Sequence, residues 1–406
     1  AILENRATGR TMATINVVKK RSEPLLAGRN KYAVDYWLLL GTAALLVLGF
    51  LMVYSTTFDL GLRFKDNPTY YMTRQVGAIV LGVAAIAFIM QFDYHALRII
   101  SLPLIAVTIV LLVFLLFFGQ VDYGAARALS QGSYQPSELA KLATILYIAH
   151  WLHSKGDRIK QINYGLVPFS IITGVMFSLI VLQPALSTSI LVGLISFTLF
   201  FVAGADLKQV LLVGIVAGGV VLLLMTVLPH AAQRVNDYRA ALVDPFQASY
   251  QVRQALGALA QGGLFGVGLG QGVQKFGALP LAHTDGVFAI VGEEMGLFGA
   301  LGVIALLAFL TWRGFRVAAR ARDTYGFLLA VGVTVWIAYQ ALINLAVITS
   351  VIPFTGMPLP FLSYGGSSML ITLIGIGILL NVSRDGAAGS FARRPETRRA
   401  GTQQTN

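Results

Sequence analysis

The stretch YWLLLGTAALLVLGFLMVYSTTF, residues 36–58, contains no Asp, Glu, Lys or Arg. A helix of about 20 apolar residues crosses the hydrocarbon core of a bilayer, so this stretch predicts a membrane-spanning helix. The whole chain has the same bias, because hydrophobic types make up 56% of its 406 residues and charged types only 12%. Soluble globular domains carry about twice that share of charge. The composition therefore excludes a disordered chain and argues against an ordinary soluble enzyme.

The other gaps between charged residues predict eight more crossings, and two of these gaps are long enough for two helices each. Gln183-Pro184 divides the first long gap, and the Pro- and Gly-rich stretch 353–366 divides the second. One further run, 137–154, is amphipathic and carries Glu138 and Lys141; we count it as a crossing because the topology closes only if it spans. The sequence thus predicts an all-α polytopic membrane protein with about ten transmembrane helices and one long extracytoplasmic loop.

Basic residues are distributed unevenly between the two predicted sides. With the N-terminus inside, 21 Lys and Arg lie in inside segments and 8 in outside segments, and Lys141 lies within a helix. Cytoplasmic segments of membrane proteins carry such an excess. We therefore expect both termini in the cytoplasm. The formal charge of +12 follows from this topology and does not indicate a nucleic-acid-binding surface.

The predicted membrane domain extends over residues 34–384, between two basic cytoplasmic tails, 1–33 and 385–406. The first tail is polar and lacks the apolar core of a cleaved signal peptide. The chain contains no Cys, which excludes disulfides and Cys metal ligands.

The predicted outer loop, 229–285, is too long to be a simple connector. It contains the glycines Gly262, Gly263, Gly266, Gly268, Gly270 and Gly272. No strand precedes them, so they make a weak dinucleotide fingerprint and predict instead a loop lying close against helix ends. Residues 248–260 have the pattern of an amphipathic helix on the membrane surface. Asp285, beside His283 and Thr284, opens the eighth crossing, either as a helix cap or as a functional carboxylate.

Other polar groups also allow two interpretations. Glu138 and Lys141 share a helix face, as a structural ion pair or as the charged wall of an aqueous cavity. Glu293 and Glu294 lie further along the eighth crossing, where carboxylates face a cavity or a partner; the structural alternative is a hydrogen bond to a small polar side chain. Arg127, in an outer loop, either binds phosphate or flanks the interface.

The segment from Pro353 to Ser368 is irregular because its three prolines do not fit a regular helix. Irregular backbone at membrane depth is tolerated where it is buried in protein or lines a wet cavity. The segment is therefore either a tight re-entrant loop or a cavity lining in which backbone amides and Ser363, Ser367 and Ser368 meet a polar ligand.

Four of these stretches, in this order, resemble the SEDS family of peptidoglycan glycosyltransferases, of the FtsW and RodA type. They are Gln135-Pro-Ser-Glu-Leu-Ala-Lys141; Tyr250-Gln251 with the glycines to Gly270; Leu279-Pro280 with His283-Thr-Asp285 and Gly292-Glu-Glu-Met-Gly296; and Pro358-Leu-Pro-Phe-Leu-Ser-Tyr-Gly-Gly-Ser-Ser368. The resemblance covers about residues 36–384. Gln274-Lys275 and Thr355-Gly356 are more similar to the FtsW type.

The chain departs from the family pattern at several positions. Leu281 replaces a Glu, Gly286 replaces a larger residue after the Asp, Ala185 replaces an Asp, and the Trp-containing run before the first motif is reduced to Gly124-Ala-Ala-Arg127. No family role is assigned to these positions, or to Ala128. Asp285 and the Glu138/Lys141 pair match the pattern.

The resemblance implies polymerisation of lipid II, a disaccharide-peptide on a polyprenyl pyrophosphate, at the outer face of a bacterial cytoplasmic membrane, for cell division or elongation. It implies Asp285 as the catalytic residue and a class B penicillin-binding protein as partner. The leaving group is already a stable anion, so one base and cations for the pyrophosphate are sufficient. The candidate substrate-binding residues are Arg127, Lys275, His283, Thr284, Ser363 and Ser367. A divalent cation (Mg or Mn), with Asp285 as a possible ligand, is the candidate cofactor. A lipid II flippase and a non-catalytic scaffold are the alternatives.

Overall fold

The computed structural model describes residues 34–118, 120–122, 125–128 and 135–392. The predicted tail 1–33 and the end of the second tail, 393–406, lie outside these residues. The regular secondary structure of the described residues is helical except for one short antiparallel hairpin, in which β1 (Gln120–Asp122) pairs with β2 (Ala125–Ala128).

Each of the ten predicted crossings contains a helix. The ten helices are α1 (Tyr36–Lys65), α2 (Tyr70–Ile89), α3 (Leu97–Phe118), α4 (Pro136–Lys155), α5 (Val167–Val181), α6 (Leu186–Val202), α7 (Leu207–Val227), α10 (Val287–Ala319), α11 (Thr324–Ile348) and α12 (Gly366–Ala392). Eight helical segments of the described chain are long and apolar enough to span a membrane. The other two are α6, which is apolar but has 17 residues, and the amphipathic α4. The C-terminal helix continues past the expected boundary at residue 384.

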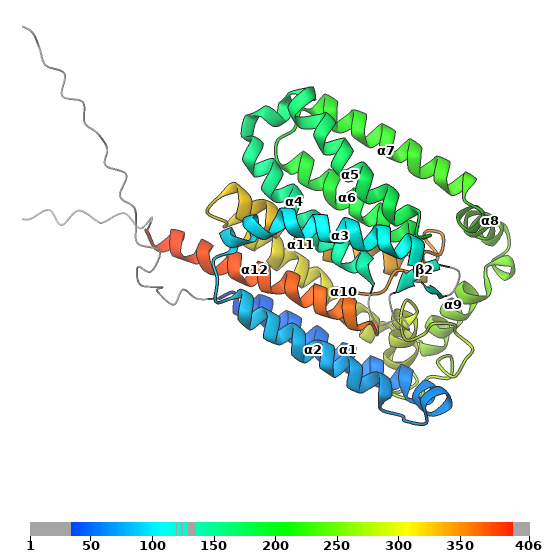
Figure 1. Cartoon of the computed structure of the whole chain (residues 1–406). Helices are drawn as coiled ribbons and strands as arrows, with labels where there is room; N and C mark the ends of the chain where they lie inside the picture. Colours follow the sequence, from blue (N-terminus) through cyan, green and yellow to red (C-terminus); the bar gives the residue numbers. More distant parts are fainter. Residues whose placement is uncertain (1–33, 119, 123–124, 129–134, 393–406) are drawn as a thin grey trace, which may run out of the picture. The chain divides into compact units, whose positions relative to one another are not determined.

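The bundle has central and peripheral helices (Figure 1). The most apolar stretch of α11 is 72% buried inside the protein, whereas that of α7 is only 6% buried. Helix α11 packs against α10, α4, α6 and α12. The side chains of α7 point mostly outward, and Figure 1 shows this helix along one edge of the bundle. The exposed apolar surface of α7 is suited to lipid.

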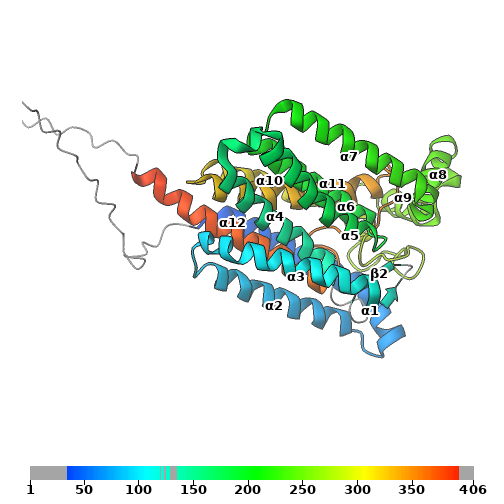
Figure 2. The same ribbon diagram turned by 45° about the horizontal axis from the view of Figure 1, so that its top comes forward.

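The long connections gather at one end of the bundle. Helix α8 (Pro229–Val243), the short 3-10 helix η4 (Pro245–Gln247) and helix α9 (Tyr250–Gly262) lie there, near β2 (Figure 2). The helix expected at 248–260 is present as α9. Its apolar face packs on α10, with Ala255 and Ala258 buried, and therefore does not lie on the membrane surface as expected.

Helix α10 is interrupted at Gly296, which has φ 65° and ψ −165°. This left-handed conformation suits glycine, which has no Cβ. The part from Leu297 to Ala319 is about 34 Å long at 1.5 Å per residue, enough to span the hydrocarbon core alone. Glu293 and Glu294 lie in the last turn before this interruption.

The opposite end of the bundle is fastened by ion pairs. Arg98 at the start of α3 contacts Asp323, the N-cap of α11, at 2.8 Å. Arg313 in α10 pairs with Asp35, the N-cap of α1. These contacts join helices that are far apart in the sequence and hold this end of the bundle together.

Candidate active site

Asp285 lies in the turn that leads into α10. The helix begins at Val287 with Gly286 as its N-cap, so Asp285 precedes the cap. Its side chain is buried, at 4% exposed, and its Oδ1 accepts a hydrogen bond from the Thr284 hydroxyl at 3.2 Å. Its Oδ2 faces Gly356, where an added Cβ would lie 3.4 Å from this oxygen. The carboxylate therefore lies between the end of the long loop and the segment 353–366.

Hydrogen bonds join the segment 353–366 to the turn that carries Asp285. The Ser363 hydroxyl donates to the Thr284 carbonyl and accepts from the Leu359 amide at 2.7 Å. The Tyr364 amide donates to the carbonyl of His283 at 2.8 Å. The structure thus brings together four sequence-predicted residues: His283, Thr284, Asp285 and Ser363.

Two amide side chains that the sequence analysis missed support the same region. Asn344 of α11 donates to the carbonyls of Asp285 at 2.9 Å and Met357 at 2.7 Å. Gln75 of α2 accepts from the amide of residue 365 at 3.2 Å and donates to the carbonyl of Ser363 at 3.4 Å. Both amides are buried. A buried polar residue on an apolar helix needs a partner, which is the signal that could have identified them.

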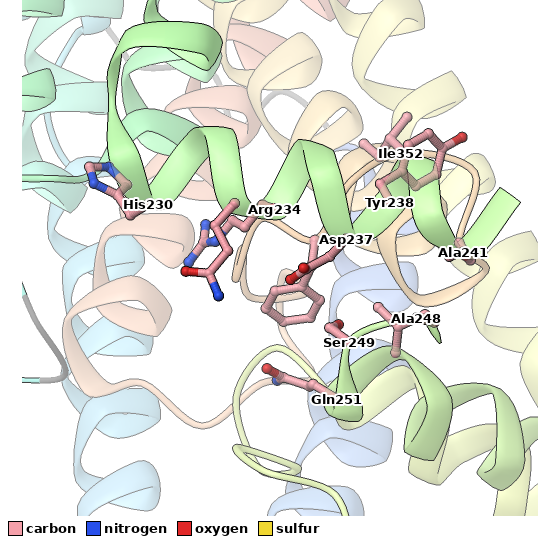
Figure 3. A pocket seen from close by; sticks show the side chains of 13 residues that line it. His230, Arg234, Asp237, Tyr238, Ala241, Ala248, Ser249, Gln251 and Ile352 are labelled. Carbon is pink, nitrogen blue, oxygen red and sulfur yellow. The ribbon is translucent and has the colours of Figure 1, made fainter. Parts of the chain in front are cut away.

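Arg234 of α8 lines a cavity and also interacts electrostatically with the Asp285 carboxylate. It donates to the carbonyl of Thr355 at 3.3 Å, and its guanidinium lies 5.9 Å from the centre of the Phe354 ring. The cavity, of about 300 Å³, is bounded by α8, the first turn of α9 and residues 350–354. Figure 3 shows His230, Arg234 and Asp237 along α8, with Ser249 and Gln251 at the start of α9 on another side of the cavity. Asp285 does not line this cavity, but its charge interacts with that of Arg234, which does.

The surroundings shift the pKa values of the site in ways that matter for catalysis. Burial raises the pKa of Asp285 to about 6, although the nearby backbone amides, the Thr284 hydroxyl and the charge of Arg234 act in the opposite direction. Burial also lowers the pKa of His283 to about 4. Asp285 is thus mainly ionised at neutral pH with a basicity close to that pH, and His283 is neutral and supplies no charge for a phosphate.

Glu138 and Lys141 form the structural ion pair that was one of the two alternatives. The Lys141 Nζ donates to the Glu138 Oε1 at 2.9 Å and lies 2.8 Å from the Oε2, and both side chains are buried. Lys141 also donates to the Gln340 Oε1 at 2.8 Å, and the Gln340 Nε2 donates to the carbonyl of Pro358 at 3.0 Å. The ion pair of α4 therefore supports the segment 353–366 through Gln340 of α11.

Lys275, a candidate substrate-binding residue, is bound inside the protein. Its Nζ donates to the Glu294 Oε1 at 2.6 Å, the Ser55 Oγ at 2.8 Å and the Gly270 carbonyl at 2.8 Å. An ammonium group has three hydrogens, so all three have acceptors inside the protein. We therefore do not place Lys275 in the substrate site. The Ser55 hydroxyl also donates to Glu294, as the structural interpretation of this carboxylate predicts.

Two other candidates are not brought to this cluster by any described contact. Arg127 lies in β2, and its side chain is outside the described part of the structure. Ser367 lies in the first turn of α12 and is half-buried. Their roles in substrate binding stay predictions.

The residues that the structure describes contain no group of three His, Cys, Asp or Glu side chains that could hold a metal ion. A divalent cation at Asp285 would therefore need substrate phosphates and water for most of its ligands. Mg²⁺ commonly binds in this way, with one or two carboxylates and several phosphate or water oxygens.

These features define a class: polytopic membrane proteins whose polar site lies in the connecting segments at one end of a helical bundle. The chain belongs, more narrowly, to the FtsW/RodA/SpoVE family, whose model, described as "Cell cycle protein", matches residues 36–387.

Known relatives cover nearly the same region. The chain is 39% identical to the stage V sporulation protein E of Bacillus subtilis, over 87% of this chain and 98% of that protein. It is 36% identical to a probable peptidoglycan glycosyltransferase FtsW of Trichlorobacter lovleyi, over 86% and 93%.

Solved structures agree with these relatives. A chain from "Structural coordination of polymerization and crosslinking by a peptidoglycan synthase complex" matches with a TM-score of 0.70 and 29% identity, over 87% of this chain and 98% of that chain. The rod shape determining protein RodA of Thermus thermophilus matches with a TM-score of 0.64 and 28% identity, over 87% and 97%. The all-α SEDS fold and the family resemblance are thereby confirmed.

Proposed function

We propose that this chain is a peptidoglycan glycosyltransferase that polymerises lipid II into glycan strands, for cell division or elongation. Relatives at 34 to 37% identity are named as probable enzymes of this kind. The observation in this chain that supports the proposal best is the buried Asp285, with a pKa of about 6 beside Arg234. A general base is most effective when its pKa lies near the working pH.

The reaction needs one proton acceptor and one anionic leaving group. A sugar hydroxyl of one lipid-linked unit attacks the anomeric carbon of another, and the new C–O bond forms as its proton passes to the Asp285 carboxylate. The C–O bond to the pyrophosphate breaks, and its electron pair leaves with the polyprenyl pyrophosphate. At pH 7 a carboxylate with a pKa near 6 is ionised in roughly nine molecules out of ten, so the base is available.

The remaining groups bind and orient the substrate. Arg234 places a positive charge beside the site, where a guanidinium can contact phosphate oxygens. Thr284 and Ser363 fix the turn of Asp285 and the segment 353–366, and His283 contributes a neutral polar ring. If Asp285 instead acted as a ligand of a divalent cation shared with the pyrophosphate, that cation would neutralise negative charge on the leaving group. Arg127 is a further candidate ligand for the pyrophosphate.

A test of this function uses the purified protein in vesicles with labelled lipid II. Asp285→Asn should abolish polymerisation, because an amide cannot accept the proton. Asp66→Asn is the matched control: Asp66 is exposed and has φ 50°, a conformation that Asn accepts readily. Polymerisation by a folded Asp285→Asn protein would refute the assignment. Transbilayer movement of lipid II without polymerisation by the wild type would favour the flippase alternative, and neither activity would favour the scaffold.

The orientation and the partner belong to the same proposal. The excess of basic residues in the connections opposite α8 and α9 supports a cytoplasmic location for that end and an outer location for Asp285. Because the chain has no Cys, a cysteine at Asp66 should react with a membrane-impermeant reagent in spheroplasts, and one at Arg158 only after permeabilisation. The reverse pattern would contradict this topology. Similarity to a chain of a peptidoglycan synthase complex supports a class B penicillin-binding protein as partner.

A further inference from the structure

The loop that follows α9 presents apolar side chains outward. Phe265 is 78% exposed and Val273 is 63% exposed. We call the exposed apolar residues of this loop the loop patch, which consists of Leu264, Phe265, Val267, Leu269, Val273 and Phe276. The only charged side chain between residues 254 and 284 is Lys275, and it is buried against Glu294. The loop thus places its charge inward and its apolar groups outward, the reverse of a loop in water.

Hydrogen bonds fix this outward orientation. The amides of Val267 and Gly268 donate to the carbonyls of Glu293 and Glu294 at 2.9 and 3.0 Å. The Glu293 carboxylate accepts from the amide of Val273 at 2.7 Å. These bonds hold the backbone against α10, so the loop cannot turn its apolar side chains inward without breaking them.

The loop patch continues the apolar surface of α10. The ring of Phe265 lies 5.4 Å from the ring of Phe298, measured between centroids. Leu297, Phe298 and Leu301 are exposed on α10, directly after its interruption at Gly296. The patch therefore adjoins the exposed apolar face of α10 that follows Gly296. Phe and Leu side chains are among those that interfacial protein segments bury at the boundary between lipid headgroups and acyl chains.

We propose that the loop patch inserts into the outer leaflet of the membrane, so that the lipid surface is its partner. An exposed apolar patch marks an interaction site, and continuity with the lipid-facing part of α10 favours lipid over a protein as the occupant. The inserted loop would hold the turn that carries Asp285 next to the leaflet. This binding does not depend on the polymerase activity and is tested without it.

Spin labels on introduced cysteines test the proposal, because the native chain has none. The full chain carrying Phe265→Cys or Val273→Cys is reconstituted into phosphatidylcholine–phosphatidylglycerol vesicles. Accessibility to oxygen, which concentrates in the bilayer, is compared with accessibility to a water-soluble nickel chelate. Phe298→Cys is the membrane control, and Asp66→Cys is the aqueous control. Melting curves of each labelled protein confirm that it is folded.

We expect the ratio of oxygen accessibility to nickel accessibility at both loop labels to be at least several-fold higher than at Asp66. It should be similar to the ratio measured at Phe298. Ratios like that of Asp66 at both positions would overturn the proposal. Labels that neither reagent reaches would also overturn it, in favour of a protein contact, and spin–spin broadening would identify a second copy of the chain as the occupant.

Discussion

Replacing Asp285 with Asn should stabilise the protein at neutral pH while it removes the proposed base. Burial raises the pKa of this carboxyl from 3.8 to about 6, and this value already includes the attraction of Arg234. A difference of one pKa unit corresponds to about 1.4 kcal/mol, so ionisation of Asp285 costs the folded state about 3 kcal/mol. An Asn side chain of nearly the same shape carries no charge and avoids this cost.

The pH dependence of the effect has a definite sign. Because the pKa of the folded protein is the higher one, the stabilisation from a protonated Asp285 is complete below about pH 3.8 and is lost as the pH rises through 6. The advantage of the Asn variant should therefore grow over this range and be constant above it. It should be about twice as large at pH 7.5 as at pH 5.

Thermal unfolding in detergent at these two pH values measures the effect. The melting temperature of Asp285→Asn should exceed that of the wild type by several degrees at pH 7.5 and by less at pH 5. Asp66→Asn changes an exposed carboxylate in the same way and is the control for the substitution itself. A melting temperature of Asp285→Asn at or below that of the wild type at pH 7.5 would refute the reasoning from burial.

Three further predictions concern the groups around the site. Lys141→Met alone should destabilise the protein by about 3–5 kcal/mol, and the double variant Lys141→Met/Glu138→Gln should be destabilised by less. Strictly additive losses in a double-mutant cycle measured by thermal unfolding would argue against the ion pair. Asn344→Leu should cost about 2 kcal/mol or more by leaving two buried carbonyls unpaired, with reduced polymerisation, whereas wild-type melting and activity would contradict this role. Gly266→Ala should lower the melting temperature, because its Cβ would lie 2.2 Å from the Glu294 carbonyl, and an unchanged melting curve would refute the close approach.

Nine of the ten crossings could be predicted because each corresponds to a local run without charged residues, whereas the run at 137–154 carries Glu138 and Lys141 and was inferred from the topology. The break at Gly296 could not, because a glycine among apolar residues looks the same whether the helix continues or not. The glycines of the outer loop predicted close packing correctly: an added Cβ at Gly262 would lie 1.9 Å from the Gly292 carbonyl. Close contact explains Gly262, Gly266 and Gly272, whereas positive φ angles explain Gly263, Gly268 and Gly270. No nucleotide is needed to account for these glycines.

The site was only partly predictable. His283, Thr284 and Asp285 are adjacent in the sequence, and resemblance pointed to them together. Arg234 reaches the site only because α8 folds back over the segment 353–366, which no local pattern indicates. The same holds for Lys275, whose charge is compensated by Glu294 on a different element of the structure.

The pH dependence of polymerisation tests most directly whether Asp285 is the base. With lipid II in vesicles, kcat/KM should be constant above about pH 7 and should fall about tenfold per unit below about pH 6, as the carboxylate becomes protonated. Asp285→Glu should keep some activity with a displaced acidic limb, since the longer side chain places its carboxylate in a different environment. An acidic limb that is the same in the wild type and in Asp285→Glu, or substantial activity in Asp285→Asn, would contradict the assignment.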